Sequence, residues 1–370
     1  MAIGAGTVQH HDTAPEYLTT GAATWAKEWI IMADRSIQTR RSRICRLPGV
    51  RVVGTGSFVP DNVVANEDLA SLGCDADWIV QRTGIRQRRH APPGMTTSEM
   101  AIHAAQRCLE QSGRSAEEID LVVLGTFTAD LPMPATACQI QDRLGINAPA
   151  FDLQAACAGF IYSMITGMQF VANGTSTLAL LVGADTNSRV ANPNDKKTYP
   201  LFGDGAGAVL VEAGSDQQGL MAYTLGADGS GHDLLCIPMG GSAEPVNPQG
   251  ASAGEQFMQM EGRPVFKWAV RLIESTVRDV TREAGLEVDD IDLFIMHQAN
   301  SRIIDAAAEN LGVDSEKVLV NVDRYGNTSA GSIPLALDEA FRDGKIHPGS
   351  RIILSGFGGG LAWGTALLVW

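Results

Sequence analysis

The chain has 370 residues, 45% of them apolar, and its 28 Lys and Arg against 42 Asp and Glu give a formal net charge of −14. This composition suits a large core or two fused domains and excludes an intrinsically disordered chain. The acidic balance argues against nucleic acid or an anionic membrane as a partner, because proteins that bind phosphate backbones carry a basic excess. No window reaches the roughly 18 apolar residues of a membrane span.

Residues 1–46 differ in pattern from the rest of the chain. They combine an irregular start, a short helical-looking stretch and the basic run "RSIQTRRSRICR". We expect a loosely ordered N-terminal extension or a start codon assigned too early, without a secretion signal, because Asp12 and Glu16 stand where such a signal is apolar. The six cysteines show no CxxC or Cys/His spacing, which favours a reduced, cytoplasmic protein over a disulfide framework or a metal site.

After this segment, short β-branched runs alternate with helix-length segments, which is typical of an α/β fold. The runs lack polar alternation, as expected of strands that are covered on both faces. In chain order, the expected strands include residues 121–127, 178–184, 207–212, 293–297, 351–356 and 365–370.

The order of these elements recurs at a spacing of about 170 residues. The strand and helix in residues 121–144 correspond to those in 293–311, and "FDLQAAC" corresponds to "LVNVDRYGNTSAG". Each half then has an apolar strand followed by a glycine-containing strand. The pattern predicts an internal duplication, with halves at 47–218 and 219–370. Two such halves would bring matching strand ends to one crevice, where active sites lie.

Cys157 follows a predicted strand and precedes a predicted helix, where the helix dipole and unpaired N–H groups favour a thiolate. A small buried cysteine is also an ordinary core residue, so its position alone does not establish a nucleophile. The second half adds His297 at a strand end and Asn327 before a helix whose position duplicates that of Cys157. The three together indicate acyl transfer, with a thioester on Cys157 and two hydrogen-bond donors facing an oxyanion.

Two glycine-rich stretches, at residues 201–209 and 356–364, are predicted to be tight turns. Within the second, Gly358–Gly360 could bring a backbone N–H group to a reacting carbonyl. Neither stretch matches a phosphate-binding motif in a strand-to-helix context.

The stretch "DADWIVQRTGIRQRRH" gathers arginines beside Trp78 in an otherwise acidic chain. An aromatic ring with guanidinium groups is suited to stacking on a nucleotide base and pairing with phosphates. A solvated basic turn is the alternative interpretation. The arginines are Arg82, Arg86, Arg88 and Arg89.

Together these motifs resemble the β-ketoacyl-acyl carrier protein synthase III family. The resemblance runs from about residue 50 to the C-terminus and rests on "DLQAACAGFIY", "HQANSRI", "RYGNTSAGSIPLALDEA", "GFGGGLAWG", "DWIVQRTGIRQRR" and "LFGDGAGAVL". It implies an α/β thiolase fold, with two βαβαβαββ halves in a five-layered αβαβα body, and a homodimer. It also implies that no metal or cofactor is needed, because acyl-CoA is a substrate.

The resemblance implies roles for the residues that match these motifs. Cys157 would accept the acyl group, while His297 and Asn327 would polarise the malonyl thioester. The backbone N–H groups of Cys157 and Gly359 would form the oxyanion hole of acyl transfer. Phe357 would pack between the catalytic groups.

The resemblance also implies binding residues. Trp78 and Arg82 would hold the adenine end of coenzyme A, and Asn300 would line the pantetheine tunnel. Lys267 and Arg302 would meet the acidic acyl carrier protein, forming the local basic patch that an acidic chain needs for an anionic partner.

The implied reaction begins fatty acid synthesis. A short acyl group passes from acyl-CoA to Cys157 and condenses with malonyl-acyl carrier protein, giving 3-oxoacyl-acyl carrier protein, CO2 and CoA. The chain departs from the family pattern at three positions, of which two leave the binding of coenzyme A open and the third leaves the primer's length and branching open. Cys74 replaces a frequent threonine, Lys196 replaces a coenzyme-contacting arginine, and Met133 replaces an aromatic residue that closes the primer pocket across the dimer.

Other functions stay open at this point. A starter-unit ketosynthase or acyltransferase of secondary metabolism could use the same residues. A cysteine thioester hydrolase would also place its nucleophile on a strand-to-helix turn, but it needs a late histidine paired with an acid, and His347 lies in a predicted surface turn. A noncatalytic acyl-binding protein is the third class.

Overall fold

The computed structural model describes residues 42–370 of the chain, so most of the predicted extension 1–46 lies outside the described residues. Strand β1 (Ile44–Pro48) nevertheless begins within that segment and pairs antiparallel with β9 (Gly219–Ala227). Leu47 of β1 is buried in the central apolar core. The folded body therefore starts before the predicted boundary, because β1 contributes to the core.

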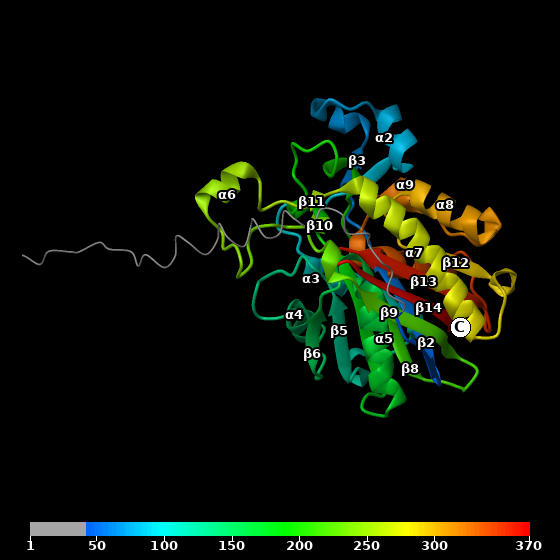
Figure 1. Cartoon of the computed structure of the whole chain (residues 1–370). Coiled ribbons are helices and arrows are strands. Elements are labelled where there is room, and N and C mark those ends of the chain that lie inside the picture. Colours follow the sequence, from blue (N-terminus) through cyan, green and yellow to red (C-terminus); the bar gives the residue numbers. More distant parts are fainter. Residues whose placement is uncertain (1–41) are drawn as a thin grey trace, which may run out of the picture. The chain divides into compact units, whose positions relative to one another are not determined.

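Two five-stranded sheets organise the described chain (Figure 1). The first has the order β2-β8-β7-β5-β6 and the second the order β1-β9-β14-β13-β12. Apart from edge strands β6 and β1, the two sheets follow one pattern, since β2-β8-β7-β5 corresponds to β9-β14-β13-β12, which confirms the predicted duplication. The remaining strands are β2 (Val50–Phe58), β5 (Leu121–Gly125), β6 (Ala150–Leu153), β7 (Leu178–Asp185), β8 (Gly205–Ala213), β12 (Leu293–Met296), β13 (Arg351–Gly358) and β14 (Ala362–Val369).

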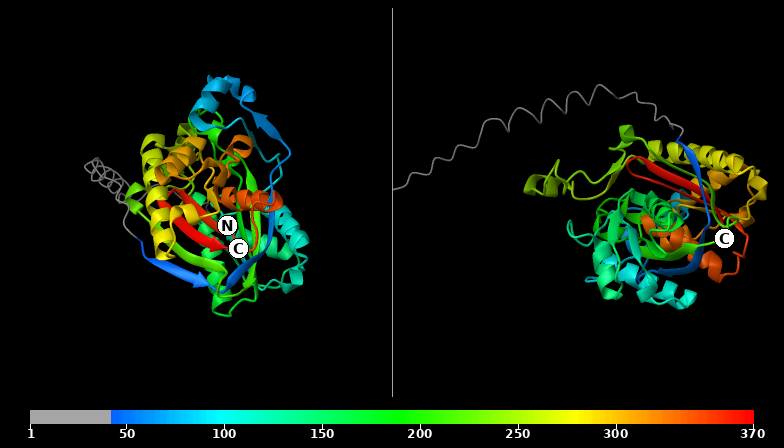
Figure 2. Two further views of the ribbon diagram at one scale, coloured as in Figure 1. Left: turned by 90° about the vertical axis from the view of Figure 1, so that its right-hand side faces the viewer. Right: turned by 90° about the horizontal axis from the view of Figure 1, so that it is seen from below.

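Helices lie between the two sheets and on their outer faces. The central helices α5 (Gly159–Ala172) and α10 (Ser332–Arg342) share one apolar cluster with strands of both sheets. Helices α3 (Thr97–Ser112) and α4 (Thr136–Arg143) cover the first sheet. Helix α7 (Gly262–Glu283), with α8 (Ser301–Leu311) beside it, covers the second (Figure 2). The result is the five-layered αβαβα arrangement predicted for a thiolase fold.

Short elements connect these layers. The short strands and α-helices among them are β3 (Val63–Ala65), α2 (Ala76–Thr83), β4 (Gln87–Arg89), β10 (Leu235–Cys236), α6 (Pro248–Ala253), β11 (Gln259–Met260) and α9 (Val322–Tyr325). The short 3₁₀ helices are η3 (Glu67–Leu72), η4 (Ala116–Glu118), η5 (Ala156–Ala158), η6 (Asn187–Arg189), η7 (Tyr199–Leu201), η8 (Gly229–Gly231), η9 (Val288–Asp290), η10 (Ser315–Lys317) and η11 (Ser329–Gly331). Across residues 42–370, no helix is both long and apolar enough to cross a membrane.

The sequence explains the main elements locally. Strands β5 and β7 are buried along their whole length, which is why they read as continuous apolar runs. Helix α3 begins at a capping box in which Thr96 and Glu99 each bond the other's backbone N–H, and it ends at Gly113 in the left-handed conformation.

The second half lacks a full counterpart of edge strand β6. Only one bridge forms there, between Val318 and Phe294. The side chain of Gln298 hydrogen-bonds the segment that follows Val318. Its Nε2 donates to the Leu319 carbonyl at 3.1 Å, and its Oε1 accepts from the backbone N–H of Asn321 at 2.9 Å. A buried amide side chain thus replaces the strand ladder.

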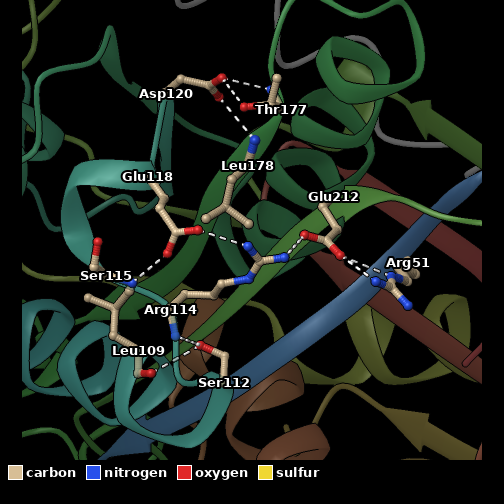
Figure 3. A network of polar contacts seen from close by, with 10 residues as sticks. All are labelled: Arg51, Leu109, Ser112, Arg114, Ser115, Glu118, Asp120, Thr177, Leu178 and Glu212. Atoms are coloured by element: carbon tan, nitrogen blue, oxygen red, sulfur yellow. Dashed lines mark hydrogen bonds and ion pairs between the residues drawn. The ribbon is translucent and has the colours of Figure 1, made fainter.

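An ion-pair network joins strands and helices at the end of the first sheet away from Cys157 (Figure 3). Glu212 on β8 accepts from Arg51 on β2 at 2.6 Å and also from Arg114, which follows α3. Arg114 in turn bonds Glu118 at 2.8 Å. These contacts connect β2, β8 and the segment after α3. They are partly exposed, so each contributes little to the free energy of unfolding.

Candidate active site

Cys157 lies in the turn η5, between the end of β6 and the start of α5. The turn is sharp, because Ala156 has φ +45°, a left-handed value that residues other than glycine rarely adopt. Cys157 is buried, with 6% of its surface exposed. The structure therefore places the thiol just before the helix, where the sequence predicts it.

The glycine run after β13 permits close backbone contact around Cys157. A Cβ atom at Gly358 would lie 2.7 Å from the backbone nitrogen of Cys157, and one at Gly359 would lie 2.8 Å from the Leu235 carbonyl oxygen. Only Gly360 of this run has a positive φ, +140°. Close approach of the backbone, rather than turn conformation, requires Gly358 and Gly359.

The thiol of Cys157 has one hydroxyl neighbour, because Ser329 Oγ donates a hydrogen bond to Cys157 Sγ at 3.3 Å. Burial raises the pKa of Cys157 to about 12; the Ser329 hydrogen bond opposes this shift and the Asp185 carboxylate adds to it. Burial therefore acts against the thiolate that the position before a helix favours, and the thiol is protonated near pH 7 in this structure.

His297 follows β12 and is almost completely buried. Its Nδ1 lies 2.6 Å from Ser332 Oγ, and that oxygen also accepts from the backbone N–H of Gln298 at 3.4 Å. We assign the Ser332 hydrogen to Nδ1, which places the imidazole proton on Nε2, the ring nitrogen without a protein partner in the described residues. Burial lowers the pKa of His297 to about 3, so the ring is neutral near pH 7.

Asn327 lies between α9 and η11, and hydrogen bonds fix both its backbone N–H and its backbone carbonyl. Its N–H donates to the Leu201 carbonyl at 2.8 Å, and its carbonyl accepts from Gly203 N–H at 3.0 Å and from Asn187 Nδ2 at 3.3 Å. Its Oδ1 accepts from the N–H of Ser329 at 2.8 Å. With Oδ1 engaged, the Nδ2 group is the end of the amide that can donate to a ligand.

The glycine stretch 201–209 supports this segment. A Cβ atom at Gly203 would lie 2.1 Å from the Tyr325 carbonyl oxygen, so glycine is required for the contact with Asn327. None of the glycines of this stretch has a positive φ. Most of the stretch predicted as a tight turn is strand β8, which begins at Gly205, and its glycines serve close packing.

Two cavities meet at Cys157. The first is lined by Cys157, His297, Asn327, Asn300, Phe266 and Phe357, and the second by Cys157, Tyr162, Cys236, Ile237, Met258 and Gly359. Phe202 and Leu235 line both. The Phe357 ring packs edge-on against the His297 ring, with 5.2 Å between the centroids. The structure thus brings together the thiol, the imidazole and the amide.

Of the residues expected to bind coenzyme A, Asn300 lines the first cavity, and Trp78 and Arg82 lie on the adjoining helix α2. The Arg82 guanidinium stacks over the Trp78 ring on α2, 5.0 Å from its centroid. Asn300, which lines the cavity, caps α8 and donates to the Arg82 carbonyl at 3.1 Å. This hydrogen bond ties α2 to the cavity wall.

The arginines of the basic stretch around α2 differ in burial, since Arg82 is exposed and Arg88 is buried. Arg88 is fully buried and donates to Asn66 Oδ1 at 2.7 Å and to the carbonyls of Pro200 at 2.7 Å and Val64 at 3.1 Å. Burial lowers its pKa to about 10. The interpretation of Arg88 as part of a nucleotide-binding cluster is wrong, because its guanidinium is buried and both terminal nitrogens donate inside the protein.

The three departures from the family pattern lie in different environments. Cys74 is buried with Leu69 and Ile79, so it packs the small core beneath α2. Lys196 is exposed on the loop between η6 and η7 and lines neither cavity at Cys157. Met133 is 84% exposed.

The two cations expected to contact a carrier protein lie on neighbouring helices. Lys267 is exposed on α7, and Arg302 is exposed on the first turn of α8. The Arg302 guanidinium lies over the ring of Phe266, 5.8 Å from its centroid, and Phe266 lines the first cavity. The structure therefore places Arg302 close to the wall of the first cavity.

Comparison with known proteins gives consistent matches along the chain. Models of the 3-oxoacyl-[acyl-carrier-protein] synthase III family match residues 151–229 and, for its C-terminal part, 281–370. A β-ketoacyl-[acyl-carrier-protein] synthase III of Rhodopirellula baltica is 53% identical over 342 residues, covering 88% of this chain and 99% of the relative. One of Desulfitobacterium hafniense is 47% identical, covering 87% and 98%. The crystal structure of the Aquifex aeolicus 3-oxoacyl-[acyl-carrier-protein] synthase III is 41% identical, with a TM-score of 0.79 over 87% of this chain and 100% of its own.

The chain belongs to the β-ketoacyl-acyl carrier protein synthase III family. This confirms the predicted family, thiolase fold and enzyme class. The synthase is a condensing acyltransferase that initiates fatty acid synthesis. The matches do not favour a starter enzyme of secondary metabolism.

The sequence did not reveal the polar residues that hold Cys157, His297 and Asn327 in place. They are Ser329, Ser332, Gln298 and Asp185. Adjacency is the signal that could have found three of them, since Gln298 follows His297 and both serines share the "GNTSAGS" stretch with Asn327. Asp185 ends the buried strand β7, where an acidic side chain needs internal donors.

The low pKa of His297 predicts a specific loss of stability in acid. An unfolded imidazole titrates near pH 6.5 and the folded one near 3, so the unfolded synthase binds more protons as the pH falls below 6.5. Between pH 7.5 and 5.5 this group should cost about 1 kcal/mol of unfolding free energy. Urea unfolding of wild type and His297→Gln at both pH values measures it. Equal losses in the two proteins would contradict the assigned protonation state.

Proposed function

We propose that Cys157 is the nucleophile of this synthase and that His297 and Asn327 stabilise the malonyl enolate. The observation that carries the proposal is the single cavity that these three side chains share. In the first step, the Cys157 sulfur bonds the acyl carbon and coenzyme A leaves with the thiol proton. In the second, malonyl-acyl carrier protein loses CO2, and the enolate carbon attacks the thioester and releases Cys157.

The two donors suit a charge that exists only during reaction. His297 is neutral with its proton on Nε2, and Asn327 has its Nδ2 group available, so both can bind a developing enolate oxygen. Buried donors with fixed orientation stabilise such a charge more than water does. The Phe357 ring beside His297 limits the competition from solvent.

The oxyanion of acyl transfer would form on the other side of the sulfur. We assign it to the N–H groups of Cys157 and Gly359, because both residues line the second cavity. The contact of Gly358 with the Cys157 backbone fixes the spacing of these two segments. The two steps use only side chains, N–H groups and the thioester substrates, so we propose that no metal or cofactor takes part.

Single variants should separate the two steps. Cys157→Ala should abolish acylation and condensation but leave malonyl decarboxylation. His297→Ala and Asn327→Ala should each slow decarboxylation about 100-fold or more, the effect of losing an oxyanion donor, while self-acylation survives. Labelled acyl-CoA and ¹⁴C-malonyl-acyl carrier protein measure the two steps. Normal condensation by Asn327→Ala would exclude its role, and acylation followed only by release of free acid would favour a hydrolase.

The first cavity is the proposed path of the pantetheine arm, with Asn300 on its wall and Trp78 and Arg82 at the adenine end. The stacked pair of Trp78 and Arg82 presents an aromatic face and a guanidinium on one helix, which suits a base and a phosphate. Lys196 keeps the charge of the arginine usual in the family but cannot stack, so its contribution to binding should be smaller.

We propose that acyl carrier protein docks at Lys267 and Arg302. Both cations are exposed next to the residues that line the first cavity, in a protein whose net charge is −14. An acidic partner would otherwise be repelled, so these local cations should control its approach.

Charge reversal tests this surface. Lys267→Glu and Arg302→Glu should raise the KM for malonyl-acyl carrier protein about tenfold, with kcat nearly unchanged, and added salt should reduce the difference. Arg282→Glu is the matched control, because Arg282 is exposed near the other end of α7. An equal effect of all three reversals would show a general charge effect instead of a docking site.

We also propose a cytoplasmic homodimer. All six cysteines are unpaired, as expected in a reducing compartment. The loop before α4 exposes Met133 at 84% and Leu131 at 49%. A surface cavity lined by Leu131 shares Phe127 and Gln154 with the second cavity at Cys157. A partner subunit seated on this loop would cover its apolar residues, and each Met133 would reach the primer cavity of the other subunit.

Substitutions of Met133 connect assembly with primer choice. Met133→Asp should shift the sedimentation profile toward monomer, whereas Met133→Trp should keep the dimer and shorten the acyl-CoA chains accepted. A screen of acyl-CoA substrates from two carbons upward measures the second effect and identifies the primer. An unchanged chain-length profile in Met133→Trp would show that Met133 does not close the cavity.

A further inference from the structure

The Ser329 hydroxyl contacts the sulfur on which acyl transfer depends. Ser329 is fully buried and donates to Cys157 Sγ at 3.3 Å. A buried sulfur anion loses its hydration, so a hydrogen bond from a fixed donor stabilises it strongly. We assign His297 and Asn327 as hydrogen-bond donors to the enolate oxygen. Ser329 is then the side chain that donates to the Cys157 sulfur.

The backbone of Ser329 is held in a conformation that serine rarely adopts. Its φ is +52°, within the left-handed region. Two hydrogen bonds maintain it: Ser329 N–H donates to Asn327 Oδ1 at 2.8 Å, and Ala330 N–H donates to Asp185 Oδ2 at 3.0 Å. Such a conformation costs about 1 kcal/mol or more and persists where the surroundings enforce it. This turn places the Ser329 hydroxyl beside both the Cys157 sulfur and the Asp185 carboxylate.

Asp185 is itself fixed by donors from another segment. Its Oδ1 accepts from the hydroxyls of Thr126 and Thr128, each at 2.9 Å, and from Phe127 N–H at 2.9 Å. Asp185 is fully buried, so these bonds replace its hydration. The carboxylate thereby connects the loop after β5 to η11 and holds the Ser329 turn.

We propose that Ser329 is a catalytic residue of acyl transfer, with its hydroxyl donating to the Cys157 sulfur as the thiolate forms and again as the thioester breaks. Asp185 is a positioning residue. The acyl carbon gains a bond to Cys157 and loses its bond to coenzyme A, the thiol proton goes to the departing coenzyme A sulfur, and Ser329 keeps its own proton. The inference rests on the proposed role of Cys157.

The reactivity of the thiol tests this role without any acyl substrate. We measure the alkylation rate of Cys157 by iodoacetamide between pH 7 and 9.5, following its peptide by mass spectrometry. Ser329→Ala should lower the rate about tenfold at every pH, and Ser329→Gly, which suits the positive φ, should do the same. Ser163→Ala is the matched control, because Ser163 is fully buried on α5 and its hydroxyl has no hydrogen-bond partner.

The titratable groups that face Cys157 in the described structure are Asp185 on β7, His297 after β12 and Cys236 on β10. These groups are unchanged in the Ser329 variants. An equal fall in the alkylation rate of Cys157 at every pH therefore results from the loss of the Ser329 hydroxyl. Malonyl decarboxylation should stay within about twofold of wild type, because Asn327 and His297 are retained. Alkylation at the wild-type rate in both Ser329 variants, or an equal fall in Ser163→Ala, would overturn the proposal. Wild type that alkylates normally but is not acylated by acyl-CoA would contradict the proposed function of Cys157 instead.

Discussion

Close contact of backbone with backbone is the constraint on which the site depends. A Cβ atom at Gly183 would lie 2.2 Å from the Ala330 carbonyl oxygen, and one at Gly125 would lie 2.6 Å from the backbone of Gly159. Strand ends of the first sheet therefore touch the starts of both central helices. With the contact of Gly358 against Cys157, these glycines let segments far apart in sequence share one small volume. Any side chain there would push the reacting groups apart.

Desolvation governs the chemistry of this volume. It keeps the thiol of Cys157 protonated and the imidazole of His297 neutral in the structure. The groups are oriented by neutral partners, such as the Ser332 hydroxyl and the backbone around Asn327, rather than by fixed ion pairs. A site of this kind binds an uncharged carbonyl at little cost and responds when negative charge develops on it, which is the requirement for stabilising a transition state.

Sequence patterns predicted the strands, the duplication and the convergence of Cys157, His297 and Asn327, because buried strands and strand-end polar residues leave local signals. They did not predict the contact of Ser329 with the sulfur, since a serine before a helix looks like an ordinary cap. Arg82 and Arg88 stand in one basic run, and only packing shows that the first is exposed and the second buried. The sequence indicates a close backbone approach at Gly358–Gly360 but not at Gly203, because the contact of Gly203 depends on a distant partner backbone.

The bends at Ala156 and Ser329 have nearly the same left-handed φ, +45° and +52°, and each opens a central helix of its own half. The two bends occupy equivalent positions in the two halves. Only one copy carries the nucleophile, and the other turns a hydroxyl toward it. The repeated half-molecule thus supplies two equivalent bends at one site, and this chain uses one to carry the reactive group and the other to contact it.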